Sequence, residues 1–196
     1  MYQKIKVEIE GMAPLLIHNV RLANPMDPYA KAMKKITSKR NKTDEDYVEL
    51  AHLEFIGGGY WGANQHPIIP GEVIEGGMNN AAKRRRLGPR IKAGLLSDGN
   101  WPLGYDGPKL AEKLWEDKSF VDQRMVKPPG QGRILRTRPI FHNWKLAFEL
   151  HYLPLELDPE QVEDVLGILG ASIGIGDYRP KFGRFNVLSF VAGNGE

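Results

Sequence analysis

The stretch of residues 171–185 reads Ala-Ser-Ile-Gly-Ile-Gly-Asp-Tyr-Arg-Pro-Lys-Phe-Gly-Arg-Phe, and it separates a clear helical pattern from a clear strand pattern. Glycine lets a backbone turn through positive φ, and turned backbone presents several N–H groups to one anion. Cations suit phosphate, and aromatic rings stack on bases. The stretch holds all three kinds of residue: Gly174, Gly176 and Gly183; Arg179, Lys181 and Arg184; Tyr178, Phe182 and Phe185.

Two interpretations of this stretch follow from its residues. In the first, it is a ligand-binding loop for a nucleic acid. In the second, it is a tight helix-to-strand connection whose rings pack inward and whose cations are solvated.

The segments around this stretch predict regular elements. Residues 144–153 alternate apolar and polar side chains, which indicates a strand with one buried face. Asp158-Pro159-Glu160-Gln161 is a strong helix start, and an apolar stripe continues to residue 169. Residues 4–10 alternate like 144–153, and 72–86 carry a helical stripe that includes two adjacent glycines.

Together these elements predict the fold. Their order is strand 4–10, helix 72–86, strand 133–141, strand 144–153, helix 159–169 and strand 185–191. This βαββαβ order predicts an α+β, ferredoxin-like (RRM-like) fold, with an antiparallel sheet and both helices on one face. We expect one domain, 1–196, with insertions at about 20–60 and 90–132. A long hairpin would join strands 120–126 and 133–141 through a turn at 128–132.

Composition excludes several classes of protein. The chain of 196 residues has no cysteine, which excludes disulfides, thiolate metal sites and a cysteine nucleophile. No apolar run approaches the roughly 18 residues of a membrane span. The N-terminus enters a strand pattern at once, without an apolar signal core. We therefore expect an intracellular, cytoplasmic protein with no membrane partner.

The charge is unevenly distributed, although the net value is only +3. No acid occurs from 76 to 97 or from 123 to 148, whereas acids gather at 44–54 and 156–164. Such segregation favours a polyanion partner, and a solvated basic face is the alternative. The basic residues of the two acid-free segments are Lys83, Arg84, Arg85, Arg86, Arg90 and Lys92, and Arg124, Lys127, Arg133, Arg136, Arg138 and Lys145.

Two segments resemble a known family. Ile68-Ile69-Pro70-Gly71-Glu72-Val73-Ile74-Glu75-Gly76 is similar to the opening of the first helix in the RAMP superfamily, the backbone subunits of CRISPR effector complexes and their relatives. A glycine-rich loop before the last strand, here 174–183, is the other mark of that superfamily. The chain also looks like small phage- and prophage-encoded proteins that share the segment Gly-Ile-Gly-Asp-Tyr-Arg-Pro-Lys-Phe-Gly-Arg-Phe. The resemblance implies a one-domain nucleic-acid-binding module that assembles along its ligand, with the 120–141 hairpin in the position of a thumb-like insertion.

One position departs from the RAMP pattern. Glu75 stands where those proteins usually carry lysine or another polar group. An acid does not favour phosphate at that spot, which argues against guide-RNA binding of the CRISPR type but not against nucleic-acid binding elsewhere.

Catalytic signatures are sparse in the sequence. The five histidines show no short metal-ligand spacing, and no serine has a nucleophile-elbow context. The resemblance points to one candidate, Asp27, because some RAMP subunits cut RNA with an aspartate after the first strand. The alternative for Asp27 is a turn residue between Pro25 and Pro28. We favour a protein that is not an enzyme and needs no cofactor or metal.

The sequence therefore predicts a protein that binds single-stranded RNA or DNA, with little sequence preference, and forms a homo-oligomer or filament. The alternatives are a metal-dependent RAMP-type endoribonuclease and a phage protein that acts on a host CRISPR complex. We expect Arg179 and Lys181 to meet phosphates together with Arg84 and Arg85. The predicted binding residues are Lys83, Arg84, Arg85, Arg86, Arg124, Arg133, Arg136, Arg138, Gly174, Gly176, Tyr178, Arg179, Lys181 and Arg184.

Overall fold

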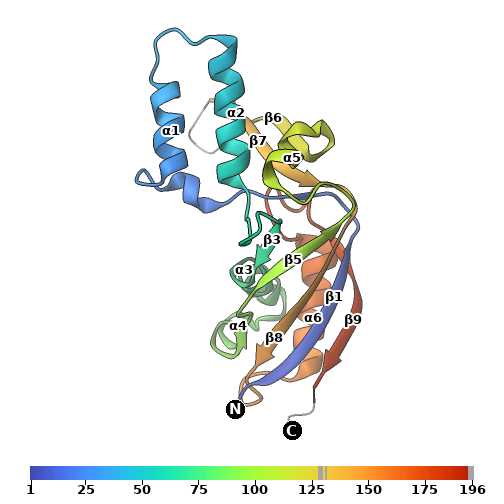
Figure 1. Ribbon diagram of the computed structural model, residues 1–196. Coiled ribbons are helices and arrows are strands. Elements are labelled where there is room, and N and C mark those ends of the chain that lie inside the picture. Colours follow the sequence, from blue (N-terminus) through green and yellow to red (C-terminus); the bar gives the residue numbers. More distant parts are fainter. Residues whose placement is uncertain (128–129, 131, 194–196) are drawn as a thin grey trace. The chain divides into compact units, whose positions relative to one another are not determined.

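The computed structural model describes residues 1–127, 130 and 132–193. It is a mixed α+β structure with antiparallel sheets, which confirms the predicted class (Figure 1). The chain divides into two compact units, one of residues 1–15, 68–106 and 141–196, and one of residues 16–67 and 107–140. The segments of the second unit overlap the expected insertions at about 20–60 and 90–132.

The first unit is built on an antiparallel sheet. Its strand order is β3 (Ile68–Pro70), β5 (Asn100–Tyr105), β8 (Trp144–Tyr152), β1 (Gln3–Gly11) and β9 (Phe185–Ala192), and β4 (Leu95–Leu96) also pairs with β8. The registers place Val7 of β1 opposite Phe148 of β8 and Phe190 of β9. The first of these pairings agrees with the alternation in 4–10 and 144–153, because it lets the apolar side chains of both strands face one core.

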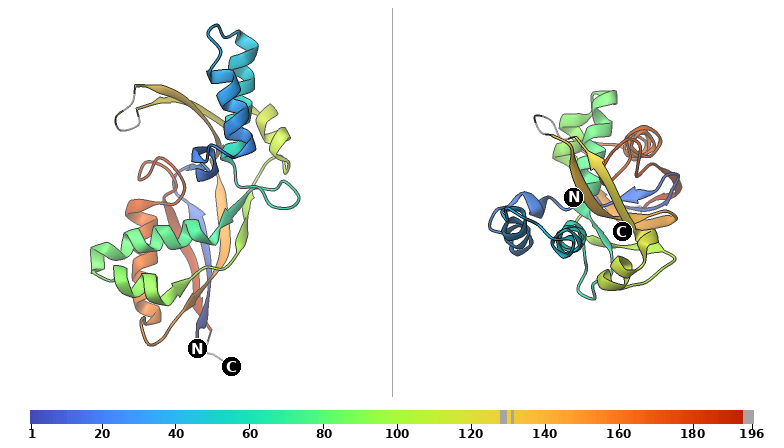
Figure 2. Two further views of the ribbon diagram at one scale, coloured as in Figure 1. Left: turned by 90° about the vertical axis from the view of Figure 1, so that its left-hand side faces the viewer. Right: turned by 90° about the horizontal axis from the view of Figure 1, so that it is seen from above.

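Helices α3 (Gly71–Ala82), α4 (Gly88–Gly94) and α6 (Pro159–Ile168) lie on one face of this sheet (Figure 2). The predicted capping box forms, with Asp158 and Gln161 closing the start of α6. A short 3-10 turn, η2 (Lys83–Arg85), follows α3, and a π-helical turn, η4 (Leu169–Ile173), follows α6. A Cβ on Gly77 would lie 3.0 Å from a methyl group of Leu169, so this glycine permits α3 to approach η4 closely.

The second unit combines two helices with a hairpin. The helices α1 (Pro28–Thr37) and α2 (Asp44–Gly58) contact each other, and Thr43 caps α2 through a capping box with Asp46. Short helical segments are η1 (Val20–Ala23), α5 (Ala111–Glu116) and η3 (Lys118–Phe120). The strands are β6 (Val121–Val126), β7 (Ile134–Phe141) and β2 (Leu15–Leu16), although Leu15 and Phe141 belong to the first unit. In the described part of the chain, no helix combines the length and apolar character of a bilayer span.

One strand of the predicted core sheet is assigned wrongly by the sequence. Residues 134–141 form β7, which belongs to a separate three-stranded sheet of order β2-β7-β6. The place beside β8 is taken by β5, where Leu103 lies opposite Leu146. Pro102 and Gly104 interrupt the strand pattern of β5. The sequence therefore predicts residues 100–105 as part of an insertion. The hairpin of β6 and β7 is confirmed, and its expected turn at 128–132 lies partly outside the described residues.

Candidate nucleic-acid interface

The glycine-rich loop between η4 and β9 is held by its own backbone. Gly174, Gly176 and Gly183 all have positive φ, at 81°, 77° and 74°. The N–H of Ile175 donates to the carbonyl of Gly183 at 2.9 Å, and the N–H of Gly183 donates to the carbonyl of Pro14 at 2.8 Å. A Cβ on Gly183 would lie 1.8 Å from the carbonyl oxygen of Ile175. The requirement for glycine at 174 and 183 is therefore structural, as the tight-connection interpretation predicts.

The three rings of the loop have different surroundings. Phe182 and Phe185 are buried, with 6% and 2% of their surface exposed, and Phe185 packs edge-on against Trp144. Tyr178 is 46% exposed, has a positive φ of 55° and lies 5.7 Å from the Phe182 ring. Of the three predicted stacking rings, Tyr178 is the one that a base can reach.

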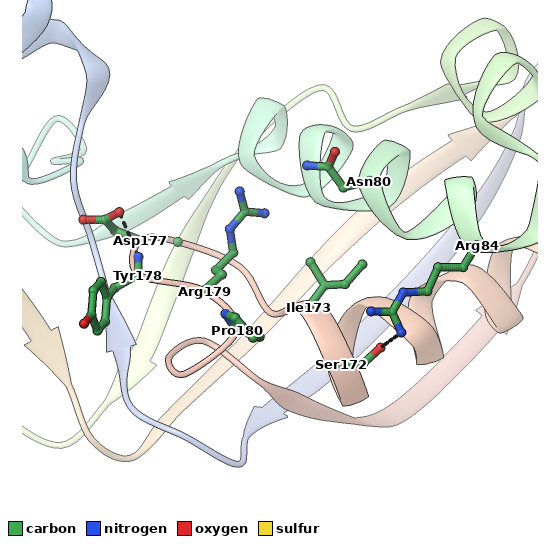
Figure 3. Close-up of a pocket in the computed structure, with 9 residues that line it drawn as sticks. Asn80, Arg84, Ser172, Ile173, Asp177, Tyr178, Arg179 and Pro180 are labelled. Carbon is green, nitrogen blue, oxygen red and sulfur yellow. Dashed lines mark hydrogen bonds between the residues drawn. The ribbon is translucent and has the colours of Figure 1, made fainter. Parts of the chain in front are cut away.

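A groove of about 550 Å³ lies between the C-terminal end of α3 and the loop (Figure 3). The Arg84 guanidinium reaches across it and donates to the Ser172 hydroxyl at 3.1 Å. That hydroxyl donates in turn to the carbonyl of Ile168 at 2.9 Å, which fixes its direction. The groove is lined by Asn80, Arg84, Ser172, Ile173, Gly176, Asp177, Tyr178, Arg179 and Pro180.

The charged groups of this groove are two arginines and one aspartate. Arg179 extends from the loop toward α3, on the side where Asn80 lies (Figure 3). Asp177 accepts a hydrogen bond from the backbone N–H of Tyr178 at 2.8 Å, so this carboxylate helps to hold the turn. The surplus of guanidinium groups makes the groove suited to an anion with several oxygens.

The other basic side chains of the α3 end and the loop differ in whether they are bound to another group of the protein. Arg85 binds Asp164 of α6 through two hydrogen bonds of 2.6 and 2.9 Å, and this contact holds the pKa of Asp164 below its ordinary value. Arg184 donates to the carbonyl of Pro180 at 2.9 Å. Lys83, Arg86 and Lys181 are exposed but do not line the groove. The structure thus places Arg84 and Arg179 on the same groove, whereas Arg85 is committed to an ion pair.

The arginines of the β6–β7 hairpin have acidic partners within the second unit. Arg138 is 2% exposed and donates to Asp122 at 3.0 Å, so the expected phosphate contact at Arg138 is corrected: its side chain is buried in the protein. Arg124 also donates to Asp122, and Arg136 donates to Glu54 at 2.7 Å. Arg133 is exposed. The acid-free segment 123–148 is therefore largely neutralised by acids from outside it.

The open face of the large sheet carries ion pairs. Alternate lysines and glutamates of β1 point to this side, and Lys4 binds Glu149 at 2.9 Å while Lys145 binds Glu10 at 2.9 Å. The hydrogen bond from Lys4 lowers the pKa of Glu149, and the one to Glu10 raises the pKa of Lys145. Because base stacking on a sheet requires exposed rings, we place the candidate interface at the groove and not on this face.

Asp27, the candidate catalytic residue, caps α1. Its carboxylate accepts from the backbone N–H of Tyr29 at 2.9 Å and from Arg21 Nε at 2.7 Å, and the residue is 9% exposed. Burial acts to raise the pKa of Asp27, but the hydrogen bonds from Arg21 and the helix backbone outweigh it and lower the pKa. Among residues 1–127, 130 and 132–193, no three His, Asp or Glu side chains gather as a metal site would require.

Five groove residues are outside the binding set predicted from the sequence: Asn80, Ser172, Ile173, Asp177 and Pro180. Asn80 lies four residues before Arg84 on the same helical path, which is a signal that sequence reasoning could have used. Ser172 and Asp177 lie inside the stretch 171–185. The sequence suggests that Asp177 orients Arg179, binds a cation or caps a turn, and its bond to the Tyr178 N–H agrees with the turn interpretation.

No protein-family model matches the chain, and no curated protein is significantly similar to it.

Proposed function

We propose that this protein binds single-stranded nucleic acid with little sequence preference, through the groove between α3 and the glycine-rich loop. The observation that carries the proposal is one groove that is lined by Arg84, Arg179 and the partly exposed Tyr178. Two guanidinium groups and an exposed ring along one groove suit the repeating unit of a single strand, which alternates phosphates and bases.

Each groove residue has a role in this proposal. Arg84 and Arg179 donate to phosphate oxygens, a contact in which the planar guanidinium can form two parallel hydrogen bonds. The Asn80 amide donates to the same backbone, and Tyr178 stacks on a base. None of these groups reads the edge of a base, so the affinity should vary little with sequence.

The strand order supports a ferredoxin-like arrangement, which we propose for the first unit. The strands β5, β8, β1 and β9 are neighbours in that order, with α3 following β1 and α6 joining β8 to β9. This order, together with the glycine-rich loop before β9, is the basis on which we propose a relationship to the RAMP superfamily. We leave RNA cleavage out of the proposal because Asp27 is engaged by Arg21 and the start of α1.

The test is the fluorescence anisotropy of labelled single strands of RNA and of DNA, titrated with the protein at several salt concentrations. We expect binding at about 50 mM salt that weakens steeply as salt rises, because counterions are released from the strand. The double variant Arg84→Ala/Arg179→Ala should bind all strands more weakly. The matched control is Lys35→Ala/Arg40→Ala, which removes the same charge from exposed positions of the second unit. The absence of binding by the wild-type protein at this salt would refute the proposal.

A further inference from the structure

The two ends of the large sheet differ in how well they are protected from strand addition. An edge strand presents a row of unpaired N–H and C=O groups, and proteins protect such rows with short strands, proline or charged side chains. At one end lies β3, which has three residues and ends in Pro70. At the other end lies β9, which has eight residues and pairs with β1 on one side, as the outermost strand of the sheet (Figure 1).

The sequence of β9 lacks charge and proline, two of the usual protections of an edge strand. It reads Phe-Asn-Val-Leu-Ser-Phe-Val-Ala, with no charge and no proline. Leu188 and Val191 are 52% and 56% exposed, although both are strand-forming apolar residues. A bulge lies where Glu8 and Ile9 of β1 face Ser189 and Val187, so that Leu188 is the extra residue. Residues 189–192 remain a regular segment at the edge, and Val191 lies within it.

We propose that β9 pairs with β9 of a second copy of this chain, in antiparallel orientation, to form a two-fold dimer with one continuous sheet. A strand can pair with itself about a two-fold axis when its side chains do not repel their own kind, and an uncharged strand meets this condition. The pairing satisfies the exposed backbone groups and covers Leu188 and Val191 of both copies.

The same contrast between the edges favours a closed dimer over a filament. A filament made by strand addition would need two exposed edges that accept each other. The short β3 offers three residues and ends in a proline, which has no N–H to donate, so it is a poor partner for β9. A β9-to-β9 contact uses the long edge of the large sheet in each copy and leaves the short β3 edge of each copy at the outside.

The proposal is tested by the mass of the full chain in solution, measured by sedimentation velocity over a wide range of protein concentration without nucleic acid. We expect the mass to double as concentration rises. Val191→Lys places a cation in the uncharged paired segment of both copies, so that like charges lie near the two-fold axis, which should weaken self-association at least about tenfold. Leu188→Lys should weaken it less, because this residue lies at the bulge. The control is Leu96→Lys, an equally drastic change at a position that is 42% exposed on β4, and this variant should dimerise like the wild type.

Circular dichroism shows whether a variant that no longer dimerises is still folded. Val191→Lys should keep the wild-type spectrum. If Val191→Lys does not fold, hydrogen exchange of the wild type decides: the amides of 185–192 should become slower to exchange as concentration rises. A single-chain mass at every concentration would overturn the proposal, as would a dimer that survives both Val191→Lys and Leu188→Lys. Because these measurements contain no nucleic acid, their outcome is independent of the proposed binding function.

Discussion

The arginines of the β6–β7 hairpin and those of the groove look alike in sequence but have different partners in the structure. In the β6–β7 hairpin, Arg138 and Arg124 share Asp122, and Arg136 binds Glu54. At the groove of the first unit, Arg84 binds a neutral serine hydroxyl, and Arg179 has no acidic partner within hydrogen-bonding distance among the described residues. The first set stabilises the protein internally, whereas the second leaves positive charge exposed at the groove, where we propose that nucleic acid binds.

The comparison teaches that an acid-free run along the chain does not establish a basic surface. Asp122 lies one residue before the run 123–148, and Glu54 is remote from it in sequence, yet both neutralise its arginines. Both acids are buried, at 6% and 4% exposed, and so is Arg138, whereas Arg124 and Arg136 are half-buried. A buried charge must be paired, so burial explains why these arginines are matched to acids.

The largest expected effect comes from Asp122. Its replacement by alanine leaves the buried Arg138 without its ion pair, and breaking a buried pair in this way costs about 3 kcal/mol. We expect the free energy of unfolding, measured by urea denaturation, to fall by about this amount. The matched variant is Asp164→Ala, which breaks the exposed pair with Arg85 and should cost at most about 1 kcal/mol. Equal losses in the two variants would contradict the distinction between the hairpin and the groove.

A smaller effect is expected at Ser172. Its hydroxyl holds the Arg84 side chain across the groove, and one hydrogen bond contributes about 1 kcal/mol. Ser172→Ala should therefore weaken nucleic-acid binding about fivefold, measured by anisotropy, while the urea midpoint changes little. Ser172→Thr retains the hydroxyl and should restore most of the affinity. An affinity that is the same in all three proteins would show that Arg84 does not need this support.

The smallest expected effect is on the stability of the protein at low pH. Hydrogen bonds from Arg85 and Lys39 lower the pKa values of Asp164 in the first unit and Asp46 in the second. The unfolded chain therefore binds protons at higher pH than the folded protein, so both carboxylates contribute stability above about pH 4 that is lost as pH falls through their folded pKa values. Urea midpoints measured from pH 7 to pH 3 should decline at the acid end, and Asp164→Asn should decline less than the wild type. A midpoint that rises with acid would contradict this assignment.

The sequence predicted correctly those elements whose signals lie within a few neighbouring residues of the chain. The alternation in 4–10 and 144–153 and the capping box at Asp158 are local, and both predicted their elements correctly. The choice between 100–105 and 134–141 as the neighbour of β8 was not local, because pairing depends on residues far apart in the chain. The buried run at the end of β7 fits either sheet equally well.

The site shows the same limit. The stretch 171–185 identified Gly176, Tyr178 and Arg179, which line the groove, but it also suggested Phe182, which is buried. Periodicity could place Asn80 near Arg84 on one helix, whereas the meeting of Arg84 with Ser172 depends on how α3 packs against η4. The acids that bind the hairpin arginines could not be predicted, because no sequence rule links Glu54 to Arg136.

The measurement that tests the central claim most directly is the salt dependence of single-strand binding in two double variants. Arg84→Ala/Arg179→Ala should reduce the slope of log affinity against log salt by about 1.4, the value for two lost phosphate contacts on a single strand, with little change in stability. Arg124→Ala/Arg136→Ala should lower stability but leave the slope and the affinity per folded molecule unchanged. The account would be contradicted if the hairpin variant lost the slope and the groove variant kept it.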